Sequence, residues 1–231
     1  LPASPEARRS LALATRVTVL QARGLDALPP DVRPRARVIE QAASAVPATP
    51  APDGVFRACL LAHVRAVKDA FLAAAAARRL PARSRVQVAH LGAALDADAA
   101  PAARAEMAAN PRYLWMGEHR RREALSVLAG SHVLVITSRL EGGSNALSEA
   151  VAAGVPVLST RIDGSVGLLG PDHPGYFPVG DAEALAGLLL RAEEDGAFLA
   201  ELRRSTARAR PLVEPARERE TWRRLLAELF P

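Results

Sequence analysis

Residues Val133–Thr160 read VLVITSRLEGGSNALSEAVAAGVPVLST. The stretch opens with a run of apolar residues that predicts a buried strand, and it closes with a second apolar run that predicts another. Between the two runs, a loop with Glu141 and a glycine pair leads into a predicted helix that carries Glu149. Because the loop and the start of this helix meet at the carboxyl edge of the sheet, we expect both carboxylates to face one ligand.

Short apolar strands alternate with helices on both sides of this unit. We predict strands at Phe56–Leu61, Arg85–His90, Tyr113–Met116, His132–Thr137, Val155–Thr160 and Gly175–Pro178. The predicted helices fall at Asp69–Leu80, Pro101–Ala109, Glu118–Ala129, Ser144–Ala153, Asp181–Glu194 and Phe198–Ala207. Right-handed crossovers between such strands give an α/β fold with a Rossmann-like, doubly wound parallel sheet that has helices on both faces.

The chain before this regular alternation is of a different kind. Residues 1–46 hold a helix at Ser4–Ala14 and at most two strands, too few for a complete α/β domain, and we expect them to be the trailing part of another domain. Repeated prolines predict a linker at residues 47–54. Residues 55–211 then form the Rossmann-like domain, and residues 212–231 form an Arg-rich amphipathic helix that is expected to pack back toward the N-terminal part.

Composition excludes several other classes of protein. The formal charge is +5, but the arginines alternate with acids, as in RRAEEDGAF, and no basic surface with interleaved aromatics marks a nucleic-acid-binding protein. No apolar run approaches the roughly 20 residues of a membrane helix, so no stable membrane insertion is expected. The single cysteine, Cys59, lies in the apolar run FRACLLA, which predicts a buried structural thiol and a reducing, cytoplasmic location.

The histidines do not predict a metal site. His90, His119, His132 and His173 have no mutual spacing of the kind that metal ligands show. His119 and the arginines at 120–122 begin a helix near the ligand edge of the sheet, where they are further candidates for a phosphate contact.

The loop after the strand at 56–61 carries two cations. Arg65 and Lys68, in AHVRAVKD, are placed to meet phosphates, since Arg offers a planar fork of donors and Lys a compact charge. His63 in the same loop is either a second phosphate contact or an ordinary loop residue. The alternative for the whole loop is a solvated basic segment.

The loop before Glu149 suits a diphosphate. Gly142 and Gly143 let the backbone approach a ligand and point N–H groups at it. The next helix begins near Ser144 and Asn145, so its positive end faces the same place. Glu149 in turn suits sugar hydroxyls, although a lone glutamate on a helix is more often a surface residue.

The joint pattern is more specific than its parts. It combines S-x-x-E-G-G and E-A-x-A-x-G-x-P-V with R-x-x-K one strand away, and it resembles the nucleotide-sugar half of the family-4-like GT-B glycosyltransferases. The resemblance implies that Glu149 binds ribose, that Glu141 lies near the transferred sugar, and that the cations neutralise a diphosphate. The residues implied are the catalytic set Arg65, Lys68 and Glu141, and the donor-binding set His63, Gly117, Gly142, Gly143, Ser144, Asn145, Glu149 and Gly164.

This chain also departs from the family pattern. The family often has a Gly-Arg pair leading to its lysine, where this chain has Ala62 and His63 and places its arginine two residues later, at Arg65. The resemblance implies a UDP-sugar as co-substrate, with no metal and no other cofactor, because cationic side chains and helix dipoles can take the place of a metal.

A closer resemblance covers residues 56 to about 181. The strings SRLEGGSNALSEAVAAGVPVLSTRIDGSVGLLG, HVRAVKDAF, HLGAALD and NPRYLWMGE are similar to the selenosugar synthases of selenoneine biosynthesis. This implies transfer of a sugar from UDP-GlcNAc or UDP-glucose to selenophosphate, with formation of a C–Se bond. Two alternatives stay open: an ordinary O-glycosyltransferase acting on a lipid or polysaccharide, and an inert module that binds sugar nucleotides.

Overall fold

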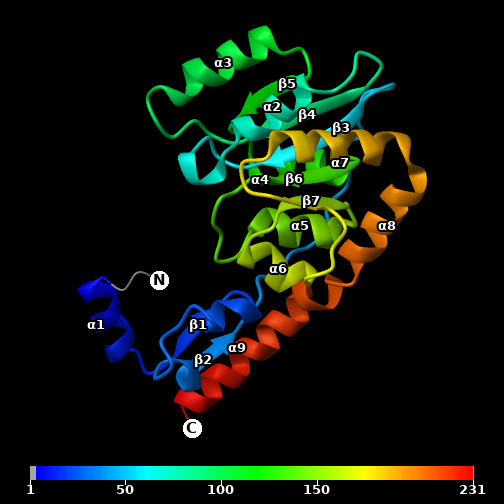
Figure 1. The fold of residues 1–231 in the computed structure, drawn as a ribbon. Helices are drawn as coiled ribbons and strands as arrows, with labels where there is room; N and C mark the ends of the chain where they lie inside the picture. Colours follow the sequence, from blue (N-terminus) through cyan, green and yellow to red (C-terminus); the bar gives the residue numbers. More distant parts are fainter. Residues whose placement is uncertain (1–3, 231) are drawn as a thin grey trace.

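The computed structural model describes residues 4–230, and a parallel sheet lies at its centre (Figure 1). Among these residues, six strands run in the order β5-β4-β3-β6-β7-β8. They are β3 (Phe56–Leu61), β4 (Val86–Leu91), β5 (Tyr113–Gly117), β6 (Val133–Ile136), β7 (Val157–Thr160) and β8 (Tyr176–Phe177). The chain builds outward from β3 to β5 and then returns to place β6 on the other side of β3. This order confirms the predicted doubly wound, Rossmann-like sheet.

Helices cover both faces of the sheet, and alternate strand residues point to opposite cores. Ala58 and Leu60 of β3 belong to a core that includes α2 (Phe71–Arg78), α7 (Ala182–Glu194) and α8 (Gly196–Ala207). Cys59 between them belongs to the second core, with α4 (Arg121–Ala129) and α5 (Asn145–Ala153). Burial raises the pKa of the Cys59 thiol to about 12. The thiol is therefore neutral at physiological pH, which confirms a buried structural cysteine.

The helix predicted at 69–80 is shorter in the structure. The segment begins with a 3-10 turn, η3 (Ala66–Lys68), and α2 starts only at Phe71. Asp69, between the two, has a left-handed backbone with φ +46°, which a continuous α-helix cannot include. The turn keeps Lys68 in the loop at the carboxyl edge of β3.

Helix α6 (Asp163–Leu169) was not predicted from the sequence. Its sequence, DGSVGLL, contains two glycines, which lower its intrinsic helix propensity. Tertiary contact compensates, because α6 packs against the N-terminal turn η1 (Ala22–Leu25). Helix α3 (Ala99–Ala109) completes the domain beside β5.

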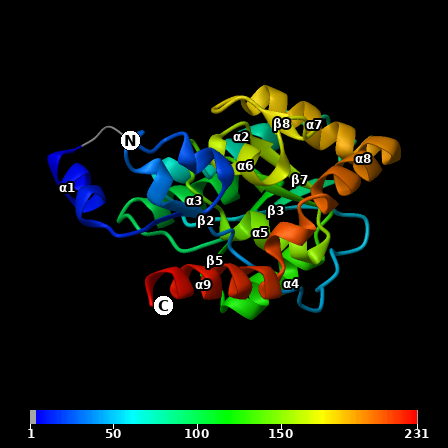
Figure 2. The ribbon, with the colours of Figure 1, turned by 90° about the horizontal axis from the view of Figure 1, so that it is seen from below.

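The N-terminal part forms a small parallel pair of strands, β1 (Val17–Val19) and β2 (Ala36–Val38), joined through η1 and η2 (Arg33–Arg35). Helix α1 (Pro5–Leu13) lies at one end of the molecule, away from the large sheet (Figures 1 and 2).

The predicted linker, residues 47–54, lies entirely within the described residues and contains no helix or strand. It is bound to α4 by a 2.8 Å hydrogen bond from the Thr49 amide to the Ser126 carbonyl. The predicted domain limits at residues 1 and 231 lie outside the described residues.

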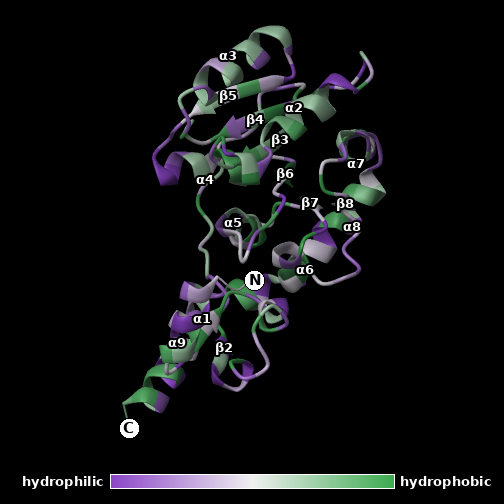
Figure 3. Cartoon of the chain, turned by 60° about the vertical axis from the view of Figure 1, so that its left-hand side comes forward, coloured by the Kyte–Doolittle hydropathy of each residue, from purple (hydrophilic) through white to green (hydrophobic). Residues whose placement is uncertain are grey.

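The last helix returns to the N-terminal part. After η4 (Arg210–Val213), helix α9 (Pro215–Leu229) runs along the small sheet, with hydrophilic and hydrophobic residues mixed along its length (Figure 3). Glu228 forms ion pairs with Arg16 at 3.1 Å and Arg37 at 2.8 Å. Of the helices within residues 4–230, none is both long and apolar enough to cross a membrane.

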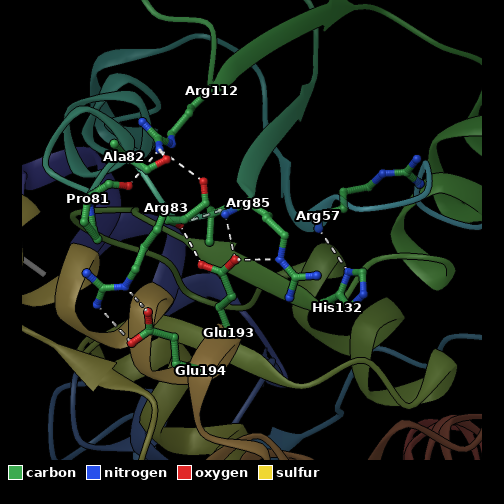
Figure 4. A network of polar contacts seen from close by, with 11 residues as sticks. Arg57, Pro81, Ala82, Arg83, Arg85, Arg112, His132, Glu193 and Glu194 are labelled. Carbon is green, nitrogen blue, oxygen red and sulfur yellow. Dashed lines mark hydrogen bonds and ion pairs between the residues drawn. The ribbon is translucent and has the colours of Figure 1, made fainter.

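A polar network closes the amino edge of the large sheet. The Glu193 carboxylate of α7 accepts hydrogen bonds from Ser84 Oγ at 2.6 Å and from the Arg85 amide at 2.7 Å, and its neighbour Glu194 pairs with Arg83 (Figure 4). In the same view, the Arg57 amide donates to His132 Nδ1 at 3.0 Å. The bonds of Glu193 and Glu194 tie the end of α7 to the start of β4, on the side of the sheet opposite the carboxyl edge.

Candidate functional site

A cleft of about 530 Å³ lies at the carboxyl edge of the sheet. The strands β3 and β6 are neighbours there, but their connections lead to opposite sides because the strand order reverses between them. In open α/β sheets such a reversal leaves a crevice in which ligands bind. Seven residues of the predicted catalytic and donor-binding sets line this cleft: His63, Lys68, Glu141, Gly143, Ser144, Asn145 and Glu149.

Lys68 and Glu141 form an ion pair across the reversal. Lys68 Nζ donates to Glu141 Oε1 at 2.5 Å, and Ser138 Oγ donates to the same oxygen at 2.7 Å. Their side chains are 25% and 10% exposed. The Thr137 hydroxyl also donates to the Lys68 carbonyl, at 2.7 Å. These bonds connect the loop after β3 with the loop after β6. They keep Lys68 and Glu141 at the cleft.

Helix α5 points its amino end into the cleft. The Leu147 and Ser148 amides donate to the Ser144 carbonyl, each at 3.1 Å, which makes Ser144 the cap. The amides of Asn145 and Ala146 precede these first helical bonds and belong to the groups that a helix leaves without an internal acceptor. Their partial positive charge, together with Lys68, favours an anion at this position.

Glu149 lies one turn further along α5 and is buried. Its side chain is 8% exposed, and Oε1 accepts from Arg121 Nη2 at 2.7 Å. The Arg121 side chain is 74% exposed and approaches from the start of α4, at the rim of the cleft. A buried carboxylate that faces a cleft and pairs with so exposed a cation can exchange that partner for ligand hydroxyl groups.

Arg121 is a site residue whose partner the sequence did not reveal. The sequence named it only together with Arg120 and Arg122, as candidates for a phosphate contact at a helix start. The structure brings it to Glu149, 28 residues later in the chain. Ser138 is the serine of the S-x-x-E-G-G pattern, but its bond to Glu141 was not predicted.

His63 faces the cleft with a defined hydrogen bond. Its Nδ1 accepts from the Ala93 amide at 3.0 Å, so the neutral ring carries its proton on Nε2. An N–H donor is thus available to a ligand.

The predicted glycines take different positions. Gly142 is a neighbour of the cleft-lining residues, and its carbonyl accepts from Gln21 Nε2 at 3.4 Å. Gly164 lies beneath Glu141, since a Cβ on it would come within 2.5 Å of the Glu141 carbonyl oxygen. Gly117 ends β5 with φ +74° and leads to Glu118 and His119, which line the cleft.

The structure does not bring Arg65 together with Lys68. Arg65 lines a separate cavity of about 300 Å³ with Asp69, Asp96 and Asp98. Of these carboxylates, Asp69 already pairs with Arg139 at 2.8 Å, and Asp96 and Asp98 add negative charge beside the arginine. Its role at the diphosphate stays a prediction that requires the side chain to move.

His90 is a buried residue that contacts the backbone next to the site. It is fully buried, and burial lowers the pKa of its imidazole to about 4. The neutral ring bonds the Tyr113 hydroxyl through Nδ1 at 2.6 Å and the Ala62 carbonyl through Nε2 at 2.8 Å. It thereby positions the backbone at the end of β3. In the part of the chain that the structure describes, no three His, Cys, Asp or Glu side chains are grouped so as to hold a metal ion.

Comparisons with known proteins agree with this architecture. The family model described as "Glycosyl transferases group 1" matches residues 46–210. The structure of HepE from Anabaena in complex with UDP is similar with a TM-score of 0.79 and 15% identity, over 97% of this chain and 70% of HepE. Sucrose-phosphate synthase from Thermosynechococcus elongatus is similar with a TM-score of 0.79 and 21% identity, over 97% of this chain and 61% of the synthase.

Among curated proteins, no sequence matches. At these identities, the similar structures show a common fold, while the family model covers more than half of the 231 residues. The chain therefore belongs to the group 1 glycosyl transferases and has the GT-B type of α/β fold.

Proposed function

We propose that the chain carries the donor site of a glycosyltransferase that uses a UDP-sugar. In this proposal, residues 55–211 bind the nucleotide-sugar, residues 1–46 are the trailing part of an acceptor domain, and residues 47–54 link the two. The observation that carries the proposal is one cleft into which a lysine, a helix amino end and a buried carboxylate all face. Its volume of about 530 Å³ suits a ligand of this size.

The charges assign a part of the donor to each group. Lys68 and the amides of Gly143–Asn145 hold the diphosphate, since they supply positive charge. Glu149 accepts from the ribose hydroxyls after it releases Arg121. Glu141, which is already held by Lys68 and Ser138, orients the transferred sugar. HepE, which has the same fold, has been solved with UDP and with UDP-glucose, and this supports the choice of nucleotide.

The reaction breaks the bond between the anomeric carbon and the diphosphate oxygen. The electron pair of that bond leaves with UDP, so negative charge grows on the oxygen in the transition state. Cations and amides that are already in place stabilise this charge more than they stabilise the bound donor, and this accelerates the reaction. Lys68 and the amino end of α5 are the groups that this chain supplies there.

For the acceptor we propose selenophosphate, with UDP-GlcNAc or UDP-glucose as donor. The selenium atom attacks the anomeric carbon, a C–Se bond forms, and UDP leaves. The support is the resemblance of four sequence segments to the selenosugar synthases. The donor cleft itself is compatible with any nucleophile that enters from the acceptor side.

Mass spectrometry of the products tests this proposal. The protein is incubated with each UDP-sugar and selenophosphate, and a product with a C–Se bond and an equal amount of UDP are expected. UDP release with a lipid or polysaccharide acceptor, and none with selenophosphate, would indicate an O-glycosyltransferase instead. Binding of UDP without turnover on any acceptor would indicate a binding module.

A matched pair of variants links the activity to the cleft. Glu141→Gln removes the charge beside Lys68 and is expected to lower turnover more than UDP affinity. Glu220→Gln makes the same chemical change on α9, where Glu220 pairs with Arg224 on the same helix. This control is expected to leave both quantities unchanged.

A further inference from the structure

Gln21 is a buried polar residue that contacts the glycine loop from outside the large sheet. It follows β1 and is 3% exposed. Its Oε1 accepts from the Gly24 amide at 3.2 Å, and its Nε2 donates to the Gly142 carbonyl at 3.4 Å. Because a backbone amide can only donate, Gly24 determines which end of the side chain faces Gly142.

Glycines let the end of β1 come very close to the donor loop and to α6. A Cβ on Gly143 would lie 2.7 Å from the Leu20 Cβ, and a Cβ on Gly167 would lie 1.9 Å from Gln21 Oε1. No larger residue fits at either place without a shift of its neighbour. The loop that carries Gly142 and Gly143 is therefore packed directly against the N-terminal part.

We propose that Gln21 is a positioning residue for the donor diphosphate, an inference that rests on the proposed UDP-sugar function. The Gly142 carbonyl and the Gly143 N–H belong to one planar peptide group, in which they point in opposite directions. When Gln21 holds the carbonyl on its own side, the Gly143 N–H is directed away from Gln21. Gly143 is one of the residues that line the cleft, and in this proposal its N–H faces the phosphates.

This assignment gives the N-terminal part a role in donor binding. Gln21 lies outside residues 46–210, which match the family model. The bond joins residues 121 positions apart, and it couples the placement of the small sheet to the shape of the phosphate loop. A small shift of the small sheet is therefore expected to change the affinity for the diphosphate more than the affinity for the ribose.

Calorimetric titration with UDP and with uridine tests the inference. For Gln21→Ala we expect the Kd for UDP to rise about tenfold and the Kd for uridine to stay within about twofold, because only the diphosphate uses the loop amides. Damage to the fold as a whole would weaken both ligands alike.

A second variant disturbs the bond between Gln21 and Gly142 without replacing either residue. Gly167→Ala places a methyl group where Gln21 Oε1 lies, and alanine is the better helix former within α6. The long side chain of Gln21 must move, so the UDP affinity should fall as in Gln21→Ala. The double variant should bind UDP no more weakly than either single one, since both remove one contact.

Arg23→Ala is the matched control. Arg23 forms an exposed 2.8 Å ion pair with Asp163, and this pair also joins η1 to α6. Its loss removes a link between the same two elements without touching the Gly142 carbonyl, so the UDP affinity should stay within about twofold.

The outcomes separate this inference from the proposed function. If the wild-type chain binds UDP and Lys68→Ala strongly weakens binding, while Gln21→Ala binds like wild type, Gln21 has no positioning role and the donor site stands. Equal weakening of UDP and uridine by Gln21→Ala also overturns the inference, since it indicates general structural damage. If the wild-type chain binds neither ligand, the proposed function fails, and the inference fails with it.

Discussion

The exchange Lys68→Met tests the centre of the proposed donor site. Methionine keeps the length of the apolar stem and removes the positive charge, which lies 2.5 Å from Glu141 Oε1. A hydrogen bond to a charged group contributes about 1.5–3 kcal/mol. Loss of this contact with the diphosphate is therefore expected to weaken UDP binding by about 2 kcal/mol, which raises the Kd about 30-fold.

The same exchange should also lower the free energy of unfolding. It leaves the Glu141 carboxylate, 10% exposed, with Ser138 as its remaining donor. Breaking a fully buried ion pair costs about 3–5 kcal/mol. Because Lys68 is a quarter exposed and water reaches the site, we expect a smaller loss of about 1–2 kcal/mol.

A double variant separates the two effects. Lys68→Met with Glu141→Gln removes both charges, so it should regain most of the lost stability in urea unfolding, whereas calorimetry should still show weak UDP binding. Arg79→Met, which breaks a 3.8 Å surface ion pair with Glu183, is the control and should change neither quantity. Unchanged UDP affinity in Lys68→Met, or recovery of affinity in the double variant, would refute the diphosphate role of Lys68.

Three further predictions concern the ribose contact and two buried polar side chains outside the cleft. Glu149→Ala removes the acceptor for the ribose, so the Kd values for UDP and uridine should both rise about tenfold in calorimetry; weakening of UDP alone would contradict the ribose role. Glu193→Ala leaves the Ser84 hydroxyl and the Arg85 amide without their acceptor, and it should lower the unfolding free energy in urea by about 1–3 kcal/mol without changing UDP affinity. The folded-state pKa of His90, about 4, lies below its usual value near 6.5, so the unfolded chain binds the proton first and stability should fall as the pH drops from 6.5 toward 4. Between pH 7 and pH 5 this amounts to about 2 kcal/mol, and His90→Gln should lose less than wild type over that interval in urea unfolding; equal losses would contradict this reasoning.

Much of the fold was predictable because it depends on local pattern. The strand at 56–61 and the helix at 145–153 follow from runs of apolar residues and from where those runs stop. Helix α6 was missed for the opposite reason, since its two glycines carry no helical signal and its stability comes from packing on η1. The start of α2 was placed too early because the left-handed backbone at Asp69 has no marker in the sequence.

Some residues of the candidate site could be predicted from the sequence in the same way, and others could not. Glu141, Gly143 and Glu149 could be assigned together, because a strand, a loop and a helix that follow one another must meet at one edge of the sheet. Arg65 could not be placed, since the cavity that it lines is completed by Asp96 and Asp98, which come from the next βα loop. Gln21 gave no signal, because its partner Gly142 is 121 positions away.

The sequence by itself determined that strands and helices alternate, that a glycine pair precedes a helix, and that two acids lie near one edge of the sheet. All of these follow from neighbours along the chain. Only the tertiary structure decided that β6 lies beside β3, which joins Lys68 to Glu141 across 73 positions, and that Arg121 pairs with Glu149. The physical reason is that strand order and packing determine which distant residues meet, and local spacing carries no record of either.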